Sequence, residues 1–190
     1  MRKVSTRLGE LDCQVLDALA EGSSPELAVV LCHGYGAPAT DLVPLAPELV
    51  QLRPELGPRV RFVFPAAPLS LAALGMPGAR AWFPLPQEVM MGQERDWERF
   101  AASVPEGLAQ ARRAVTGLLS ALSAATKLPY ERIVLGGFSQ GAMVTTDVAL
   151  RLEEAPAGLC ILSGSIISQD EWKQRAERRK GLPVLQSHGR

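Results

Sequence analysis

Unbroken apolar runs alternate with helical patterns along this chain. Runs rich in valine, isoleucine and leucine are typical of parallel strands that are covered on both faces. We expect such strands at Leu27–Cys32, at Val60–Phe64 apart from Arg61, at Ile133–Leu135, at Leu159–Leu162 and from Pro183 onward. Residues 11–19 instead alternate apolar and polar positions, which predicts an antiparallel strand at the edge of the sheet.

Helical patterns fall between these strands. Over residues 104–126, Leu108, Ala111, Val115, Leu118 and Leu122 recur at spacings of three and four and predict one buried stripe. Shorter helices are expected over 41–52, 140–152 and 169–180. Strands that alternate with helices predict an α/β fold with a mostly parallel, twisted sheet and helices on both faces. We expect one domain over residues 1–190.

Composition narrows the class of protein and its setting. Lys plus Arg and Asp plus Glu both number 20, and this balance argues against a nucleic-acid partner. The odd, widely spaced cysteines predict buried thiols rather than disulfides or metal ligands. These are Cys13, Cys32 and Cys160. We find neither a signal peptide nor an apolar run of membrane-spanning length, and we expect a cytoplasmic protein with no stable membrane anchor.

The segment Gly137-Phe138-Ser139-Gln140-Gly141 directly follows one of the predicted strands. A strand that turns sharply into a helix with serine at the apex is the nucleophile elbow of an α/β-hydrolase. Gly137 and Gly141 leave room for a strained turn and for close packing of helix on strand. A chance match in a loop is the alternative, and the predicted strand and helix on either side favour the nucleophile.

A second loop of small residues follows the strand at residues 27–32. In this class of fold one oxyanion donor is the backbone N–H after the nucleophile, here that of Gln140. The other donor comes from the loop after an early strand, and Gly34 and Gly36 let that backbone approach a substrate. We interpret His33 as a structural residue, because it precedes Ser139 and the order of a triad in this fold is serine, acid, histidine.

Four motifs occur in order along the chain and together resemble the phospholipase/carboxylesterase family of α/β-hydrolases, from about residue 29 onward. They are His33-Gly34-Tyr35-Gly36-Ala37, Phe64-Pro65-Ala66-Ala67-Pro68, Arg80-Ala81-Trp82-Phe83 and Gly136-Gly137-Phe138-Ser139-Gln140-Gly141. The resemblance implies that Ser139 is the nucleophile and that the backbone N–H groups of Tyr35 and Gln140 form the oxyanion hole. The family usually has leucine at Tyr35, which implies a more polar or narrower acyl pocket here.

The resemblance also implies a place for substrate contacts. Trp82 and Phe83 would lie near the mouth of the active site, where they contact substrate or pack the long connection over residues 65–86. The stretch Val89-Met90-Met91 would be either an adaptable flap over an acyl chain or a mobile surface loop.

The end of the chain departs from the family pattern. In the family a His-Gly pair at this strand is followed two residues later by the catalytic aspartate, and the catalytic histidine comes after another strand. The chain stops one residue past His188-Gly189. We therefore expect a truncated form of a longer enzyme, without the C-terminal strand-helix unit, the acid and the base. His188 is not the base on this interpretation.

Two functions remain open from the sequence. The first is hydrolysis of carboxylic esters or thioesters through an acyl-serine intermediate, with no metal or organic cofactor and with short-chain esters preferred. The second is a non-catalytic pseudo-hydrolase or fragment that binds an acyl ligand or a partner protein. A homodimer that buries a flat apolar face is compatible with both.

Overall fold

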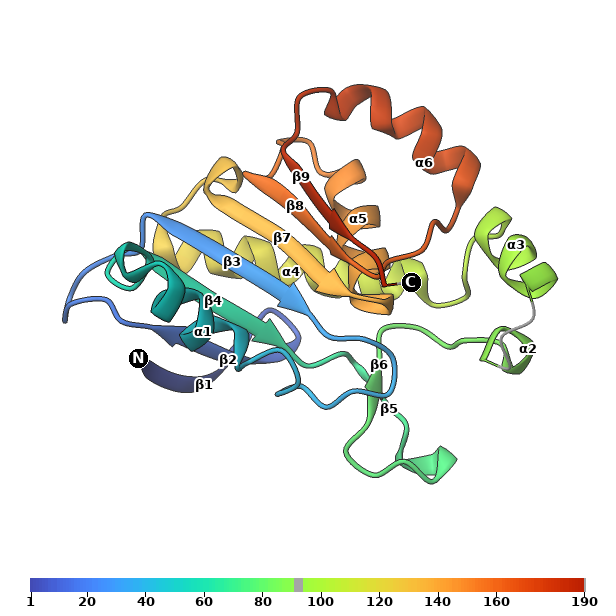
Figure 1. Ribbon diagram of the computed structural model, residues 1–190, viewed down its shortest axis with the longest axis horizontal. Helices are drawn as coiled ribbons and strands as arrows, with labels where there is room; N and C mark the ends of the chain where they lie inside the picture. Colours follow the sequence, from blue (N-terminus) through green and yellow to red (C-terminus); the bar gives the residue numbers. More distant parts are fainter. Residues whose placement is uncertain (91–93, 190) are drawn as a thin grey trace.

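The computed structural model describes residues 1–90 and 94–189, without the side chains of residues 90 and 94–96 (Figure 1). In this part of the chain a sheet of seven strands has the order β1-β2-β4-β3-β7-β8-β9. The strands are β1 (Arg2–Leu8), β2 (Leu11–Asp17), β3 (Leu27–Cys32), β4 (Val60–Pro65), β7 (Ile133–Phe138), β8 (Gly158–Leu162) and β9 (Val184–Ser187). From β4 to β9 the neighbouring strands are parallel, whereas β1, β2 and β4 pair antiparallel.

Helices cover both faces of the sheet (Figure 1). One face carries α4 (Leu108–Thr126) and α5 (Gln140–Arg151), with α6 (Gln169–Ala176) beside α5, and the other carries α1 (Leu45–Leu52). The remaining elements are α2 (Gln87–Met90), α3 (Glu94–Ala102) and a small hairpin of β5 (Leu69–Ser70) and β6 (Arg80–Ala81). Among the described helices, none is both long and apolar enough to cross a membrane.

Strand β3 shows why its sequence is continuously apolar. Its alternate residues Ala28, Val30 and Cys32 join the core that contains the buried side chains of α4 and α5. Leu31 points to the opposite side and joins the core beneath α1. A strand buried on both faces has no position left for a polar side chain, so the run of apolar residues correctly predicted a central parallel strand.

The predicted edge strand is the one element of the sheet that is wrong. The segment at residues 11–17 is a strand, but it lies between β4 and β1 rather than at the edge. The edge is formed by β1, in which Arg2–Arg7 are exposed and which pairs with β2 from Arg2↔Asp17 to Leu8↔Leu11. Its polar, charged sequence has no apolar run to mark it, and such charges are typical of protected edge strands.

The predicted helices are confirmed with shorter bounds. Helix α4 begins at Leu108 rather than at residue 104, and all five residues of its predicted stripe are buried. Helix α1 covers only the last eight residues of the predicted range 41–52, because residues 41–44 form turns. The connection over residues 65–86 holds the β5–β6 hairpin and a short 3-10 turn.

A buried carboxylate joins the three helices on one face. Asp147 of α5 is fully buried and accepts hydrogen bonds from Arg112 of α4 at 2.8 Å and from Arg151 at 3.0 Å. Its Oδ1 also accepts the indole N–H of Trp172 of α6 at 3.0 Å. Arg151 extends the network to Glu171 of α6. Because a buried charge is stable only when it is paired, this network specifies how α6 sits on α5.

We expect Asp147→Ala to lower the free energy of unfolding by about 3 kcal/mol, because it leaves the Trp172 N–H and the half-buried Arg112 without their acceptor. Arg151 loses one of its two carboxylate partners and keeps Glu171. Urea denaturation followed by circular dichroism measures the change. Glu26→Ala is the matched control, since Glu26 also pairs with an arginine, Arg59, but at the surface. Equal losses in the two variants would contradict the special role of Asp147.

Candidate active site

Ser139 stands at the junction of β7 and α5 with φ 51° and ψ −117°. A positive φ is uncommon outside glycine, and a strained backbone of this kind costs on the order of 1–3 kcal/mol. The backbone is held there from both sides. The Ser139 N–H donates to the carbonyl of Leu162 at 2.8 Å, and its carbonyl accepts the N–H of Met143 at 3.1 Å. The strand–serine–helix turn predicted from the sequence is therefore present, with a half-buried serine at its apex.

The glycine after the elbow is required by close packing. A Cβ on Gly141 would overlap the backbone of Cys32 and would lie 2.5 Å from the carbonyl oxygen of His33. On the strand side, a Cβ on Gly137 would lie 2.5 Å from the carbonyl oxygen of Cys32. The first turn of α5 thus rests directly on the end of β3, and only glycine at these positions permits that contact.

The same packing places the loop after β3 beside the serine. A Cβ on Gly34 would lie 3.5 Å from the Cβ of Ser139 and 3.1 Å from the ring of Phe138. Because β3 and β7 are parallel neighbours, both loops leave the carboxyl edge of the sheet at adjacent points. Segments 105 residues apart in sequence, at Gly34 and Ser139, therefore meet in one place.

Two backbone donors stand free next to Ser139. In the described part of the chain, no backbone hydrogen bond is made by the N–H of Tyr35 or of Gln140, whereas the neighbouring N–H of Gly36 donates to Arg80 at 2.9 Å. The Gln140 N–H opens α5, where the first amides of a helix have no intrahelical acceptor and carry the positive end of the helix dipole. In the described residues, no backbone acceptor therefore competes for either of the predicted oxyanion donors.

The contacts of His33 support the structural role predicted from its place in the sequence. It is buried, and its Nε2 accepts the N–H of Ala67 at 3.1 Å. The proton must then be on Nδ1, which donates to the carbonyl of Gly34 at 2.8 Å. Burial lowers the pKa of His33. With both ring nitrogens engaged, His33 has no free atom to take a proton from Ser139.

Trp82 and Phe83 lie in the core, with 1 % and 0 % of their surface exposed. The indole N–H of Trp82 donates to the carbonyl of His33 at 2.8 Å. This burial favours the second of the two roles considered from the sequence, packing of the long connection. Contact with substrate stays a prediction for both residues. For the predicted flap, Val89 is buried, while Met91 and the side chain of Met90 lie outside the described residues.

Two contributions to the site were not foreseen from the sequence. The side chain of Gln140 is buried and bonded to the backbone of Trp82 and Phe83. Arg80 donates to the carbonyls of Ala67 and Pro68, the latter at 3.1 Å. Both residues stand inside motifs already noted, so their presence there was the available signal, but only the tertiary contacts show what they hold.

The three cysteines offer no competing nucleophile. All are free thiols, with Cys13 and Cys32 buried and Cys160 half-buried. Burial raises the pKa of Cys13 to about 12 and raises the pKa of Cys32 and Cys160 as well. Thiols with raised pKa values remain protonated and unreactive near neutral pH. Among the side chains that the structure describes, no group of three or more His, Cys, Asp or Glu could hold a metal ion.

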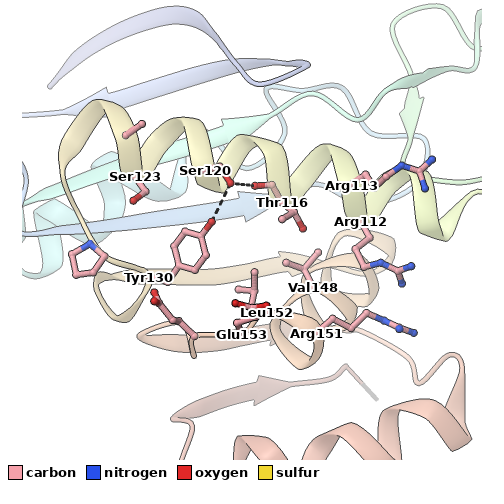
Figure 2. Close-up of a pocket in the computed structure, with 13 residues that line it drawn as sticks. Arg112, Arg113, Thr116, Ser120, Ser123, Tyr130, Val148, Arg151, Leu152 and Glu153 are labelled. Atoms are coloured by element: carbon pink, nitrogen blue, oxygen red, sulfur yellow. Dashed lines mark hydrogen bonds between the residues drawn. The ribbon is translucent and has the colours of Figure 1, made fainter.

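A large cavity lies elsewhere, along α4 and α5 (Figure 2). Its volume is about 1000 Å³, and its walls include Arg112, Tyr130 and Leu152. In Figure 2 the Tyr130 hydroxyl meets Ser120 in a hydrogen bond of 3.1 Å. Ser139 is not among the lining residues. The size of this cavity therefore says nothing about the candidate site, which rests on the geometry around Ser139.

Comparison with known proteins agrees with this geometry. Residues 17–190 match the phospholipase/carboxylesterase family. Acyl-protein thioesterase 1 of Eremothecium gossypii is 31% identical over 173 residues, which are 90% of this chain and 68% of that protein. Its counterpart in Mycosarcoma maydis is 31% identical over 179 residues, with coverage of 88% and 70%.

Solved structures show the same relationship. Esterase PE8 superimposes with a TM-score of 0.69 at 29% identity, covering 94% of this chain and 72% of its own. Acyl-protein thioesterase 2 of Zea mays has a TM-score of 0.60 at 22% identity, with coverage of 93% and 75%. At that lower identity the likeness concerns the fold alone.

The fold and the strained serine define an α/β-hydrolase. Within that class, the chain belongs to the phospholipase/carboxylesterase family, whose match begins at residue 17, ahead of the motifs that start near residue 29. Membership assigns the chain to the serine hydrolases of carboxylic esters and thioesters. The resemblance noted in the sequence is confirmed.

Acidification tests the structural role of His33. The free energy of unfolding should fall as pH drops below about 6.5, because the unfolded chain binds a proton on His33 that the buried native ring does not. In His33→Asn this contribution disappears, and the slope between pH 6.5 and pH 5 should be shallower by up to about 1.4 kcal/mol per pH unit. Urea denaturation at a series of pH values measures both slopes.

His188→Gln serves as the control, because His188 is exposed at the end of β9. This variant should keep the wild-type slope. If His33→Asn also keeps it, His33 is not buried in its neutral form.

Proposed function

We propose that Ser139 attacks the carbonyl carbon of an ester or thioester while the N–H groups of Tyr35 and Gln140 stabilise the oxyanion that forms. One observation carries this proposal. Ser139 stands in a strained turn with a positive φ, at the start of α5 and against the Gly34 loop. Such a turn exposes a serine hydroxyl between two backbone donors, and oxyanion stabilisation by such donors is often the largest single contribution to acyl transfer.

The reaction proceeds in two balanced halves. Ser139 Oγ bonds to the carbonyl carbon as its proton passes to a base, and collapse of the tetrahedral oxyanion expels the alcohol or thiol with that proton. Water then bonds to the acyl carbon as one of its protons passes to the base, the bond from that carbon to Ser139 Oγ breaks, and Oγ takes up the proton as the carboxylic acid leaves. His33 does not serve as the base, because Ala67 and Gly34 occupy its ring nitrogens. Reactivity of Ser139 therefore reports directly whether a base reaches it.

The acyl group would lie near Tyr35. This residue is half-buried against Leu71 and Ala81 at the small β5–β6 hairpin, and it precedes the glycine that bonds to Arg80. We infer a substrate of small or short-chain acyl type, as the bulk of tyrosine favours. The relatives named as acyl-protein thioesterases extend the proposal to acyl groups carried on protein thiols.

We further infer a single domain over residues 1–190 and a reducing, cytoplasmic setting. Seven of the nine described strands form one sheet, which supports the single domain. Its three free thiols suit a reducing compartment. The formal net charge of zero gives no electrostatic basis for nucleic-acid binding. An ester or thioester substrate is the partner that the site supports.

Incubation with a serine-directed fluorophosphonate should add one adduct to the wild-type chain, and Ser139→Ala should gain none. Intact-mass spectrometry before and after incubation measures both. Ser120→Ala is the matched control and should still be labelled, because Ser120 is an exposed residue of α4. A wild-type protein that gains no adduct would contradict the catalytic role and favour a non-catalytic pseudo-hydrolase that binds an acyl ligand or a partner.

Two substitutions at Tyr35 separate the role of its main-chain N–H from that of its side chain. Tyr35→Pro removes the N–H and should slow labelling of Ser139 about 100-fold, the usual loss for one oxyanion donor. Tyr35→Leu keeps the N–H and should be labelled at nearly the wild-type rate. Labelling reactions stopped after a series of times give both rates, and thermal melts verify that each variant is folded. Equal rates in the two variants would exclude Tyr35 as a donor.

A further inference from the structure

The side chain of Gln140 reaches across to a distant part of the chain. It is buried, and its Nε2 donates to the carbonyl of Phe83 at 2.7 Å while its Oε1 accepts the N–H of Trp82 at 2.8 Å. One side-chain amide therefore bonds to the backbone of two consecutive residues. Two hydrogen bonds of opposite sense fix the plane of the Gln140 side chain and, with it, the start of α5.

Trp82 carries this connection on to the other loop. Its indole N–H donates to the carbonyl of His33 at 2.8 Å, and its ring lies 5.7 Å from the imidazole of His33. The bonded carbonyl belongs to the peptide directly before the one that bears the Tyr35 N–H. An unbroken chain of contacts thus runs from Gln140 through Trp82 to His33, with one proposed oxyanion donor near each end.

Further bonds join the His33 loop to the same connection, residues 65–86. The N–H of Gly36 donates to the carbonyl of Arg80 at 2.9 Å, and the N–H of Arg80 donates to the carbonyl of Ala37 at 3.2 Å. The N–H of Ala67 donates to the His33 ring. This connection is therefore the common support of both loops, and Gln140 is the side chain through which the elbow attaches to it.

We propose that the Gln140 side chain is a positioning residue that sets the two oxyanion donors relative to each other through Trp82 and His33. The inference rests on the proposed function, since it presumes that the donors serve Ser139. The N–H of Gln140 would touch the oxyanion, whereas its side chain acts only through its partners. Donors are effective when they are held before the charge develops, so loosening this chain lowers the acylation rate.

Gln140→Met is the main test, because it keeps the backbone N–H and a side chain of similar size but removes both hydrogen bonds. The measurement is labelling by a small fluorophosphonate at several concentrations, well below the melting temperature. We expect the maximal rate of adduct formation to fall 10-fold or more, with little change in the probe concentration that gives half of that rate. A merely structural role would lower the melting temperature and leave this rate unchanged.

Two controls separate positioning from loss of stability. Gln14→Met makes the same substitution at a residue that bonds to Ser5 in the β1–β2 hairpin. Thr145→Val removes a buried hydroxyl from α5 itself, where it bonds to the carbonyl of Gly141 at 2.9 Å. Both should be labelled at the wild-type rate, even where Thr145→Val melts at a lower temperature.

Trp82→Phe tests whether the contacts act as one chain. It removes the N–H that bonds to the His33 carbonyl. The double variant with Gln140→Met should be labelled about as fast as the slower single variant, because either substitution alone already interrupts the chain of contacts. Hydrogen–deuterium exchange supplies a readout that needs no reactivity at Ser139. In Gln140→Met, exchange should rise in residues 33–37 as well as at the start of α5.

Each outcome decides between the proposals. The inference is overturned if Gln140→Met is labelled at the wild-type rate or if the two substitutions have independent effects. In either case, labelling of the wild type at Ser139 still upholds the proposed function. A wild-type chain without any Ser139 adduct overturns the proposed function. In that case unchanged exchange at residues 33–37 in Gln140→Met overturns the positioning role, and raised exchange supports the physical coupling of the two loops.

Discussion

The contact between the first turn of α5 and the end of β3 is the constraint on which the site depends. With a Cβ at Gly141, this turn would overlap the backbone of Cys32, so the helix could not start where it does. That position of the helix imposes the strained backbone at Ser139 and brings the serine next to Gly34. A strained residue persists only where its surroundings hold it on several sides. Here the supports are the parallel pairing of β3 with β7 and the bond from Ser139 to Leu162 of β8.

The buried polar groups around this contact serve two different purposes. Asp147 accepts hydrogen bonds from donors on α4, α5 and α6, and it maintains the helical layer. Gln140 and His33 instead bond to the connection over residues 65–86. Buried polar groups are tolerated only when they are fully satisfied, and a satisfied network specifies a single arrangement. The long connection, which has little regular structure of its own, is thus tied to both loops of the site.

Much of the fold was predictable because the buried strands consist mostly of apolar residues and can be recognised by them. β3, β4, β7 and β8 are covered on both faces and read as apolar runs, and the stripe of α4 matches its buried face. The main error concerns an exposed segment, whose sequence has no apolar run. β1 is an exposed, charged strand that exists because β2 offers it a partner, so its place at the edge of the sheet was missed. Similarly, the start of the helix over residues 41–52 was placed too early, in a segment that forms turns.

For the site, the sequence by itself determined the family, the turn that holds Ser139 and the loop that meets it, because a glycine-flanked serine between strand and helix has few other uses. The role of Ser139 as the nucleophile stays a prediction from the same motif. The sequence also determined that His33 precedes Ser139 in the wrong order for a base. Only the tertiary structure decided that Trp82 and Phe83 are buried and that the side chain of Gln140 bonds to their backbone. The physical reason is the separation in sequence between the interacting residues. Strand and helix patterns arise from neighbours a few positions apart, whereas these hydrogen bonds join residues 57 and 58 positions apart and exist only once the sheet brings them together.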